Sequence, residues 1–195
     1  MKTRNCYIFV FNGFADWEPA IATAALNQFT DFKIIPFSTD GKKVTSMGGL
    51  EVYPATSLDK VEASDVTLLI LPGGEAWDEG GNQEIIPLLQ GCLDKGKTVA
   101  AICGATGFLA TKGYLDHVRH TSNNLEHYLK QVAPSYKGEK LYKEVGAVRH
   151  ERLITASGAK PLDFAKVIME AFNLFENEEL KTWFSYFTWE EEHKR

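Results

Sequence analysis

Cysteine is scarce in this chain of 195 residues. The three cysteines, Cys6, Cys92 and Cys103, are odd in number, and their spacing matches neither a zinc-binding nor a CxxC pattern. No cluster of histidine, cysteine and aspartate has the spacing of a metal site either. The sequence therefore argues against a disulfide-stapled secreted domain. We expect free thiols, a reducing compartment and no metal or other cofactor.

Long apolar runs and an excess of basic residues are also missing. No segment approaches the roughly 18 consecutive apolar residues that cross a bilayer. The apolar run Cys6–Phe11 is too short for a signal peptide and lacks a small-residue cleavage site after it. Lysine and arginine number 21 against 26 aspartates and glutamates, whereas nucleic-acid binders usually carry a basic face. We therefore expect a cytoplasmic protein that binds neither membranes nor nucleic acids.

No internal repeat or flexible linker divides the chain, so we expect a single domain over residues 1–195. Short apolar runs without alternation are typical of strands buried on both faces. They occur at Cys6–Phe11, Phe32–Phe37, Val66–Leu71, Thr98–Ile102 and Leu153–Ser157. Helical patterns lie between or after them, at Glu18–Phe29, Gln83–Lys95, Gly104–Thr111, Asn123–Val132 and Pro161–Phe175, and a hairpin is expected at Val44–Val52. This alternation predicts an α/β fold, a mostly parallel sheet with helices on both faces.

The end of the chain differs from the rest. Residues 178–195 combine acidic residues with Leu180, Trp183, Phe184, Tyr186, Phe187 and Trp189. We interpret this segment as a C-terminal helical extension. Its aromatic side chains either pack on their own domain or form a subunit contact, since aromatic residues are enriched at interfaces.

Cys103 is the candidate nucleophile. It follows a buried strand, precedes a helix, and has the small residues Gly104 and Ala105 beside it, a pattern that allows the sharp turn of a nucleophile elbow. A helix N-terminus favours thiolate over thiol. The alternative is a buried structural cysteine, which fits Cys6 and Cys92 better.

Two other strand ends should meet Cys103 at the same edge of the sheet. Gly73 and Gly74 follow the third strand and allow a ligand close to the backbone, although Pro-Gly-Gly also marks ordinary turns. Glu18 opens the first helix and is either a first-turn glutamate favoured by the helix dipole or a carboxyl group aimed at Cys103. Trp17 and Trp77 are candidate pocket walls.

Together these segments resemble the ThiJ/PfpI superfamily, a branch of the class I glutamine amidotransferase-like fold. The likeness runs from Cys6 to about Phe175, through Glu18, the Leu-Pro-Gly-Gly segment at 71–74, the elbow at 101–104 and the strand at 153–158. The resemblance implies a flavodoxin-like three-layer sandwich and a homodimer. It also implies that Cys103 is the nucleophile and that Glu18 hydrogen-bonds its sulfur. Backbone N–H groups near Gly73, Gly74 and Gly104 would form an oxyanion hole.

The histidines depart from the family pattern. PfpI-type peptidases carry a histidine directly after the nucleophile, where this chain has Gly104. Other members place one in the next strand, where the best register puts Thr121 or Asn123, and His120 is close but out of register. A shift by an odd number of residues turns a strand side chain to the other face. Cys103 and Glu18 therefore form the expected pair, with His120 and Asn123 as further candidates. His127 and His150, the latter in a charged loop, are expected at the surface.

Three functions follow from this pattern. The first is a cysteine-dependent enzyme that acts on a small carbonyl or amide substrate, as a glyoxalase, deglycase, amidase or hydrolase. A PfpI-type intracellular cysteine peptidase is an alternative within that class, which the missing histidine weakens. The second is a non-catalytic sensor of oxidative stress that uses oxidation of Cys103. The third is an interaction module that kept the fold and binds partners through the aromatic C-terminal segment.

Overall fold

A seven-stranded sheet forms the centre of the protein in a computed structural model that describes residues 4–192, with side chains through residue 188. The strands run in the order β5-β2-β1-β6-β7-β9-β8, and every neighbouring pair is parallel except β8 and β9. Their bounds are β1 Arg4–Phe9, β2 Phe32–Ser38, β5 Thr56–Ser57, β6 Leu68–Leu71, β7 Thr98–Ile102, β8 Ala147–His150 and β9 Leu153–Ala156. The predicted α/β, flavodoxin-like arrangement is confirmed.

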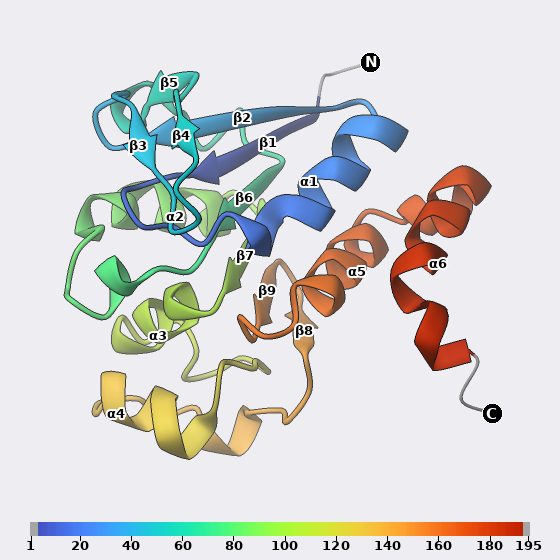
Figure 1. Ribbon diagram of the computed structural model, residues 1–195. Coiled ribbons are helices and arrows are strands. Elements are labelled where there is room, and N and C mark those ends of the chain that lie inside the picture. The colour runs from blue at the N-terminus through green and yellow to red at the C-terminus, as the bar shows by residue number, and fades with distance from the viewer. Residues whose placement is uncertain (1–3, 193–195) are drawn as a thin grey trace.

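Helices cover both faces of the sheet (Figure 1). One layer holds α1 (Trp17–Phe29) and α5 (Pro161–Ala171), which pack against each other, and the other holds α2 (Ile86–Asp94) and α3 (Gly104–Thr111), which pack on β7. A π-helical turn at Leu125–Leu129 continues into α4 (Lys130–Val132). Single 3-10 turns lie at Leu58–Lys60, Glu75–Trp77, Gln83–Ile85, Glu139–Leu141 and Leu174–Glu176. Within residues 4–192, every helix is too short or too polar to cross a lipid bilayer.

The apolar runs form the core between the two helix layers. β6 and β7 are buried along their whole length, as expected for central parallel strands. Cys6 on β1 and Cys92 on α2 are fully buried free thiols. Burial raises the pKa of Cys6, and it raises the pKa of Cys92 to about 11, so both behave as small apolar side chains.

The C-terminal helix α6 (Glu178–Glu192) lies outside α1 and α5 (Figure 1). Leu180 and Phe184 are buried, and the Trp183 ring packs on Phe29 of α1 with centroids 5.6 Å apart. Tyr186 and Phe187 on the same helix remain exposed. One side of this helix thus belongs to the core of its own chain, and the other side is open. Residues 193–195 of the predicted extension lie outside the described residues.

The strand β8 is absent from the sequence prediction, which placed His150 in a charged surface loop. That placement is wrong: His150 ends β8, is half-buried, and its Nδ1 accepts a hydrogen bond from Arg119 N at 3.0 Å. An edge strand is covered on few sides, so it tolerates charged residues. Arg149, Glu151 and Arg152 therefore obscure the apolar pattern that would have predicted β8. Glu151, at φ 51°, makes the tight turn into β9.

Several boundaries also shift. The predicted hairpin at Val44–Val52 is confirmed as β3 (Val44–Thr45) paired antiparallel with β4 (Glu51–Val52). The helix predicted at Asn123–Val132 begins only at Leu125, because the side chain of Asn124 caps it by accepting a hydrogen bond from His127 N at 2.7 Å. Asn123 is therefore left in the loop that faces the elbow.

Candidate active site

Four adjacent strands deliver the site. The order β1-β6-β7-β9 puts the carboxyl ends of these strands side by side, and the chain emerging from them carries Glu18, Gly73, Cys103 and Gly158 in turn. Ligands of parallel α/β sheets bind at this edge. The loops are tied together there, since Ala15 N donates to the carbonyl of Gly73 at 2.9 Å.

Cys103 occupies a strained elbow. Its φ of 57° and ψ of −127° lie where residues with a side chain are rarely found. Hydrogen bonds hold it there: Cys103 N donates to Ala156 O at 3.0 Å, and Thr106 Oγ1 donates to Cys103 O at 2.6 Å. Gly104 must be small, because a methyl group there would lie 2.8 Å from Gly74 O. The surrounding structure thus forces the thiol out above the sheet, as the sequence predicted.

Glu18 is a buried carboxyl group beside the elbow. Only 1% of it is exposed, and its Oε2 accepts a hydrogen bond from Gly73 N at 2.6 Å. Oε1 has no hydrogen-bond partner among the described residues. Burial raises the pKa of Glu18 to about 7, against the opposing effects of the Gly73 N–H and of the Cys103 thiol. A carboxyl group with this pKa can release and accept protons at neutral pH.

Gly73 and Gly158, which lie on different loops, enclose the side chains of Cys103 and Glu18. A methyl group on Gly73 would lie 2.6 Å from Cys103 Cβ and 2.8 Å from Glu18 Oε2. A methyl group on Gly158 would lie 2.7 Å from Cys103 Sγ and 2.8 Å from Glu18 Oε1. Real Cβ atoms do not approach other atoms so closely, so both positions require glycine. Thiol and carboxyl group consequently share one narrow slot.

Asn123 contacts the thiol from the loop after α3. Its Nδ2 donates to Cys103 Sγ at 3.3 Å, and its Oδ1 accepts from Gly158 N at 2.8 Å. The second bond fixes which end of the amide faces the sulfur. Asn123, one of the two positions where the resemblance would place a histidine, therefore supplies the sulfur with a hydrogen-bond donor that has no titratable group.

His120 lies away from the thiol. It is fully buried, and it packs between the rings of Tyr136 and Tyr142. Nδ1 donates to Val118 O at 2.7 Å, and Nε2 accepts from the Tyr136 hydroxyl at 2.5 Å. Burial lowers the pKa of His120, so the ring stays neutral. Both ring nitrogens are engaged, and the structure does not bring this histidine to Cys103.

The surroundings of Cys103 oppose the preference for thiolate that the sequence predicted from the helix N-terminus. Burial raises the pKa of the thiol to about 11, and the nearby Glu18 charge raises it further, while the Asn123 amide and the Gly104 N–H lower it. At pH 7 the sulfur is therefore protonated. Loss of hydration and the neighbouring carboxylate thus act against the lowering effect that a helix N-terminus has on a thiol pKa.

The backbone N–H groups of Gly73, Gly74 and Gly104 differ in what they contact. The Gly73 N–H is taken by Glu18, so it cannot also bind a substrate oxygen. The Gly104 N–H faces the sulfur. Gly74 N makes no hydrogen bond within the described part of the chain.

Trp77 is not a pocket wall, since it is buried against Phe108 and donates to Pro72 O at 2.8 Å.

The sequence model of the DJ-1/PfpI family matches residues 4–171 of this chain. The chain belongs to the DJ-1/PfpI family. A DJ-1 superfamily protein of Agrobacterium tumefaciens, Atu0886, is 35% identical, with 96% of this chain and 99% of that chain covered at a TM-score of 0.87. A thiJ/pfpI family protein from Bacillus anthracis is 42% identical, with 94% and 90% covered at a TM-score of 0.85. The "Uncharacterized protease YoaZ" of Bacillus subtilis (strain 168) is 39% identical over 191 residues, covering 94% of this chain and 90% of that protein.

Membership of the DJ-1/PfpI family confirms the resemblance drawn from the sequence. The structure adds Gly158 to the residues that shape the site. The sequence shows that Gly158 follows a buried strand, as Gly73 does. Glycine has no side chain that would have indicated a function there. Among the residues that the structure describes, no group of three or more His, Cys, Asp and Glu side chains is arranged to hold a metal ion.

Proposed function

We propose that this protein is a cysteine-dependent enzyme that acts on a small carbonyl or amide substrate. One observation carries the proposal: a buried carboxyl group with a pKa of about 7 shares a slot with a thiol on a strained elbow. A base that is poised near the working pH removes protons most effectively. Glu18 is that base, and Cys103 is the nucleophile.

In the reaction, the Cys103 sulfur forms a bond to the substrate carbonyl carbon while its proton passes to the Glu18 carboxylate. The carbonyl oxygen gains the electron pair of the broken π bond and becomes an oxyanion, which the N–H groups of Gly74 and Gly104 stabilise. Glu18 then returns the proton, either to the hemithioacetal oxygen of an aldehyde or to the leaving nitrogen of an amide. With an amide, water hydrolyses the resulting thioester and regenerates the thiol. With methylglyoxal, the hydrogen on the hemithioacetal carbon passes as a proton, by way of Glu18, to the neighbouring ketone carbon. The first carbon becomes a thioester carbonyl, the ketone becomes a hydroxyl group, and water hydrolyses the thioester to lactate and the free thiol.

The test measures turnover of methylglyoxal and of a chromogenic amide. Cys103→Ala should abolish turnover, and Glu18→Gln should lower kcat by about 100-fold or more, because the base is lost while the shape is kept. Cys92→Ala removes a buried thiol far from the slot and is the control that should keep activity. Full turnover by Cys103→Ala would overturn the proposal.

A cysteine peptidase is the second candidate function, because the relative YoaZ is named a protease. In this chain the side chain that contacts the sulfur is the amide of Asn123, which cannot protonate a peptide leaving group, and Glu18 would have to do so alone. Digestion of unfolded casein that is lost in Cys103→Ala would support this function. Turnover of small substrates without casein cleavage would remove it.

We also propose a homodimer in the cytoplasm. Four large apolar side chains, Trp17, Met47, Leu50 and Tyr53, are 47–72% exposed near the start of α1 and on the β3–β4 hairpin. Burying them against a second copy would remove apolar surface from water. The three unpaired thiols favour a reducing compartment.

A further inference from the structure

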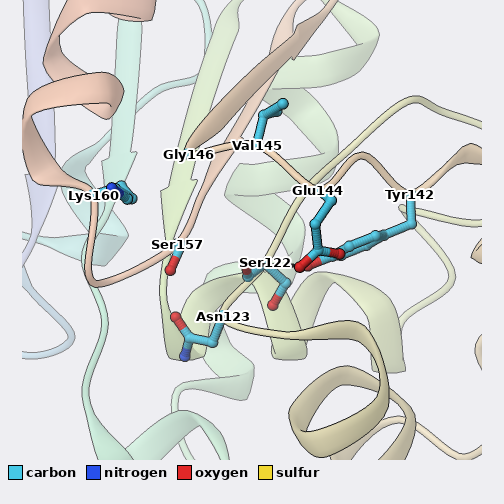
Figure 2. Close-up of a pocket in the computed structure, with 8 residues that line it drawn as sticks. All are labelled: Ser122, Asn123, Tyr142, Glu144, Val145, Gly146, Ser157 and Lys160. Atoms are coloured by element: carbon cyan, nitrogen blue, oxygen red, sulfur yellow. Dashed lines mark hydrogen bonds between the residues drawn. The ribbon is translucent and has the colours of Figure 1, made fainter.

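Asn123, the residue that contacts the thiol, also lines a polar cavity (Figure 2). Its volume is about 320 Å³, and it is lined by Ser122, Asn123, Tyr142, Glu144, Val145, Gly146, Ser157 and Lys160. That volume falls in the range of small-molecule sites, roughly 300–1,000 Å³. The cavity lies between the loop before β8 and the loop that joins β9 to α5.

Three hydrogen bonds, one of them from a side chain, hold the loops around the cavity. Ser157 N donates to Gly146 O at 3.0 Å, Lys160 N donates to Ser157 O at 2.9 Å, and Thr121 Oγ1 donates to Val145 O at 2.8 Å. The loop before β8 is therefore joined to the loop between β9 and α5 and to the segment that holds Thr121. A tied cavity keeps its shape without a ligand, which lowers the entropy cost of binding.

Opposite charges stand on the two walls. Figure 2 shows Tyr142 and Glu144 on one side and Ser157 and Lys160 on the other. Within the described residues, neither Glu144 nor Lys160 has an ion-pair partner within 4.0 Å. A ligand with a single charge would satisfy one wall and leave the other unmatched.

Asn123 connects this cavity to the slot. The same side chain that lines the cavity touches Cys103 Sγ at 3.3 Å. Cys103 is not among the residues that line the cavity, so a ligand held there reaches the thiol only across the Asn123 amide.

We propose that this cavity is a binding site for a small zwitterion, an amino acid or a molecule of similar size whose ammonium and carboxylate groups are several bonds apart. The ammonium group lies against Glu144, and the carboxylate lies against Lys160 with the Ser157 hydroxyl nearby. The inference deepens the proposed function by naming the class of substrate: carbonyl or amide compounds that carry both charges. Only the delivery of the carbonyl to Cys103 rests on that function, and binding itself does not.

The test is isothermal titration calorimetry on Cys103→Ala, in which binding is measured without chemistry. The probes are 5-aminopentanoate, pentanoate and pentylamine, which share a carbon chain and differ in charge. We expect 5-aminopentanoate to bind about tenfold or more tightly than either partner, because each lost charge removes a charge-assisted hydrogen bond. Equal affinities, or no measurable heat at millimolar concentrations of 5-aminopentanoate, would overturn the proposal.

Two variants assign the charges to the walls. Lys160→Gln should remove the advantage of 5-aminopentanoate over pentylamine, and Glu144→Gln should remove its advantage over pentanoate. Lys166→Gln and Glu84→Gln, exposed and outside the cavity, are the matched controls and should leave all three affinities unchanged. If the zwitterion binds but wild-type protein turns over neither the substrates tested above nor any charged carbonyl or amide, the enzyme proposal fails while the binding site stands.

Discussion

At the scale of single residues, the buried carboxyl group of Glu18 provides a proton acceptor but lowers the free energy of unfolding when it is ionised. Its pKa rises from an ordinary 4.5 to about 7 in the folded protein. Between those pH values the folded state binds more protons than the unfolded chain, so the free energy of unfolding falls as pH rises. The loss is complete above pH 7 and amounts to about 3 kcal/mol.

Glu18→Gln should therefore remove this pH dependence. At pH 8 we expect the variant to be about 2 kcal/mol more stable than wild type, because the neutral amide keeps a weaker hydrogen bond from Gly73 N and carries no buried charge. Below pH 4.5 the two proteins should be similar in stability. Urea denaturation from pH 4 to pH 8 measures this. A variant that is less stable at every pH would contradict it.

The Cys103 thiol should react slowly when no substrate is bound. With a pKa of about 11, its thiolate fraction at pH 8 is on the order of 100-fold below that of a free cysteine with a pKa near 8.5. Alkylation by iodoacetamide, followed by intact-protein mass spectrometry, should speed up about tenfold per pH unit from pH 8 to pH 10. A rate at pH 8 equal to that of free cysteine would contradict the raised pKa. It would favour a sensor that oxidises readily.

Gly158→Ala tests the narrow slot. The new methyl group would meet Cys103 Sγ and Glu18 Oε1, so we expect a loss of about 1–3 kcal/mol in stability and a large loss of turnover. The control is Gly91→Ala on α2, where the added methyl group would meet only Ala63 Cβ at 3.2 Å. That variant should keep its activity. Normal activity in Gly158→Ala would mean that the slot is wider than the contacts indicate.

At the scale of elements, α6 is an integral part of the domain through one face. Leu180→Ala should cost about 3 kcal/mol, since Leu180 is fully buried and the cavity left behind would not be refilled. Tyr186→Ala, on the exposed face, should change stability by less than about 0.5 kcal/mol. Thermal unfolding measures both. Equal, small effects would show that α6 is only loosely attached.

The central elements were predictable because buried parallel strands are continuous apolar runs. That pattern placed the strand before Cys103 and the strand before Gly73, and sheet topology then brought their ends together. The edge strand β8 escaped prediction because its pattern is mixed with charge. Asn123 and His120 lie in a loop whose side-chain directions depend on hydrogen bonds from distant segments, such as Gly158 and Tyr136, and local sequence carries no record of these.

At the scale of the whole molecule, the proposed homodimer has a direct test. Light scattering after size-exclusion chromatography should give twice the chain mass of 21.8 kDa. Tyr53→Glu should shift the protein toward the monomer, because a charge would be buried in an apolar contact. Tyr186→Glu on the open face of α6 is the control and should leave the dimer intact. If Tyr186→Glu separates the subunits instead, the C-terminal helix is the contact.

The four strand ends around Cys103 are drawn from residues 18 to 158, most of the length of the chain. During synthesis the thiol therefore emerges long before Gly158 closes over it. In that interval it is an ordinary exposed cysteine with a pKa near 8.5, open to oxidants and alkylating agents. Folding buries the thiol, raises its pKa and so lowers its reactivity. The nascent chain is thus chemically more vulnerable than the finished protein, and damage to this protein in a stressed cell should concentrate on newly made molecules.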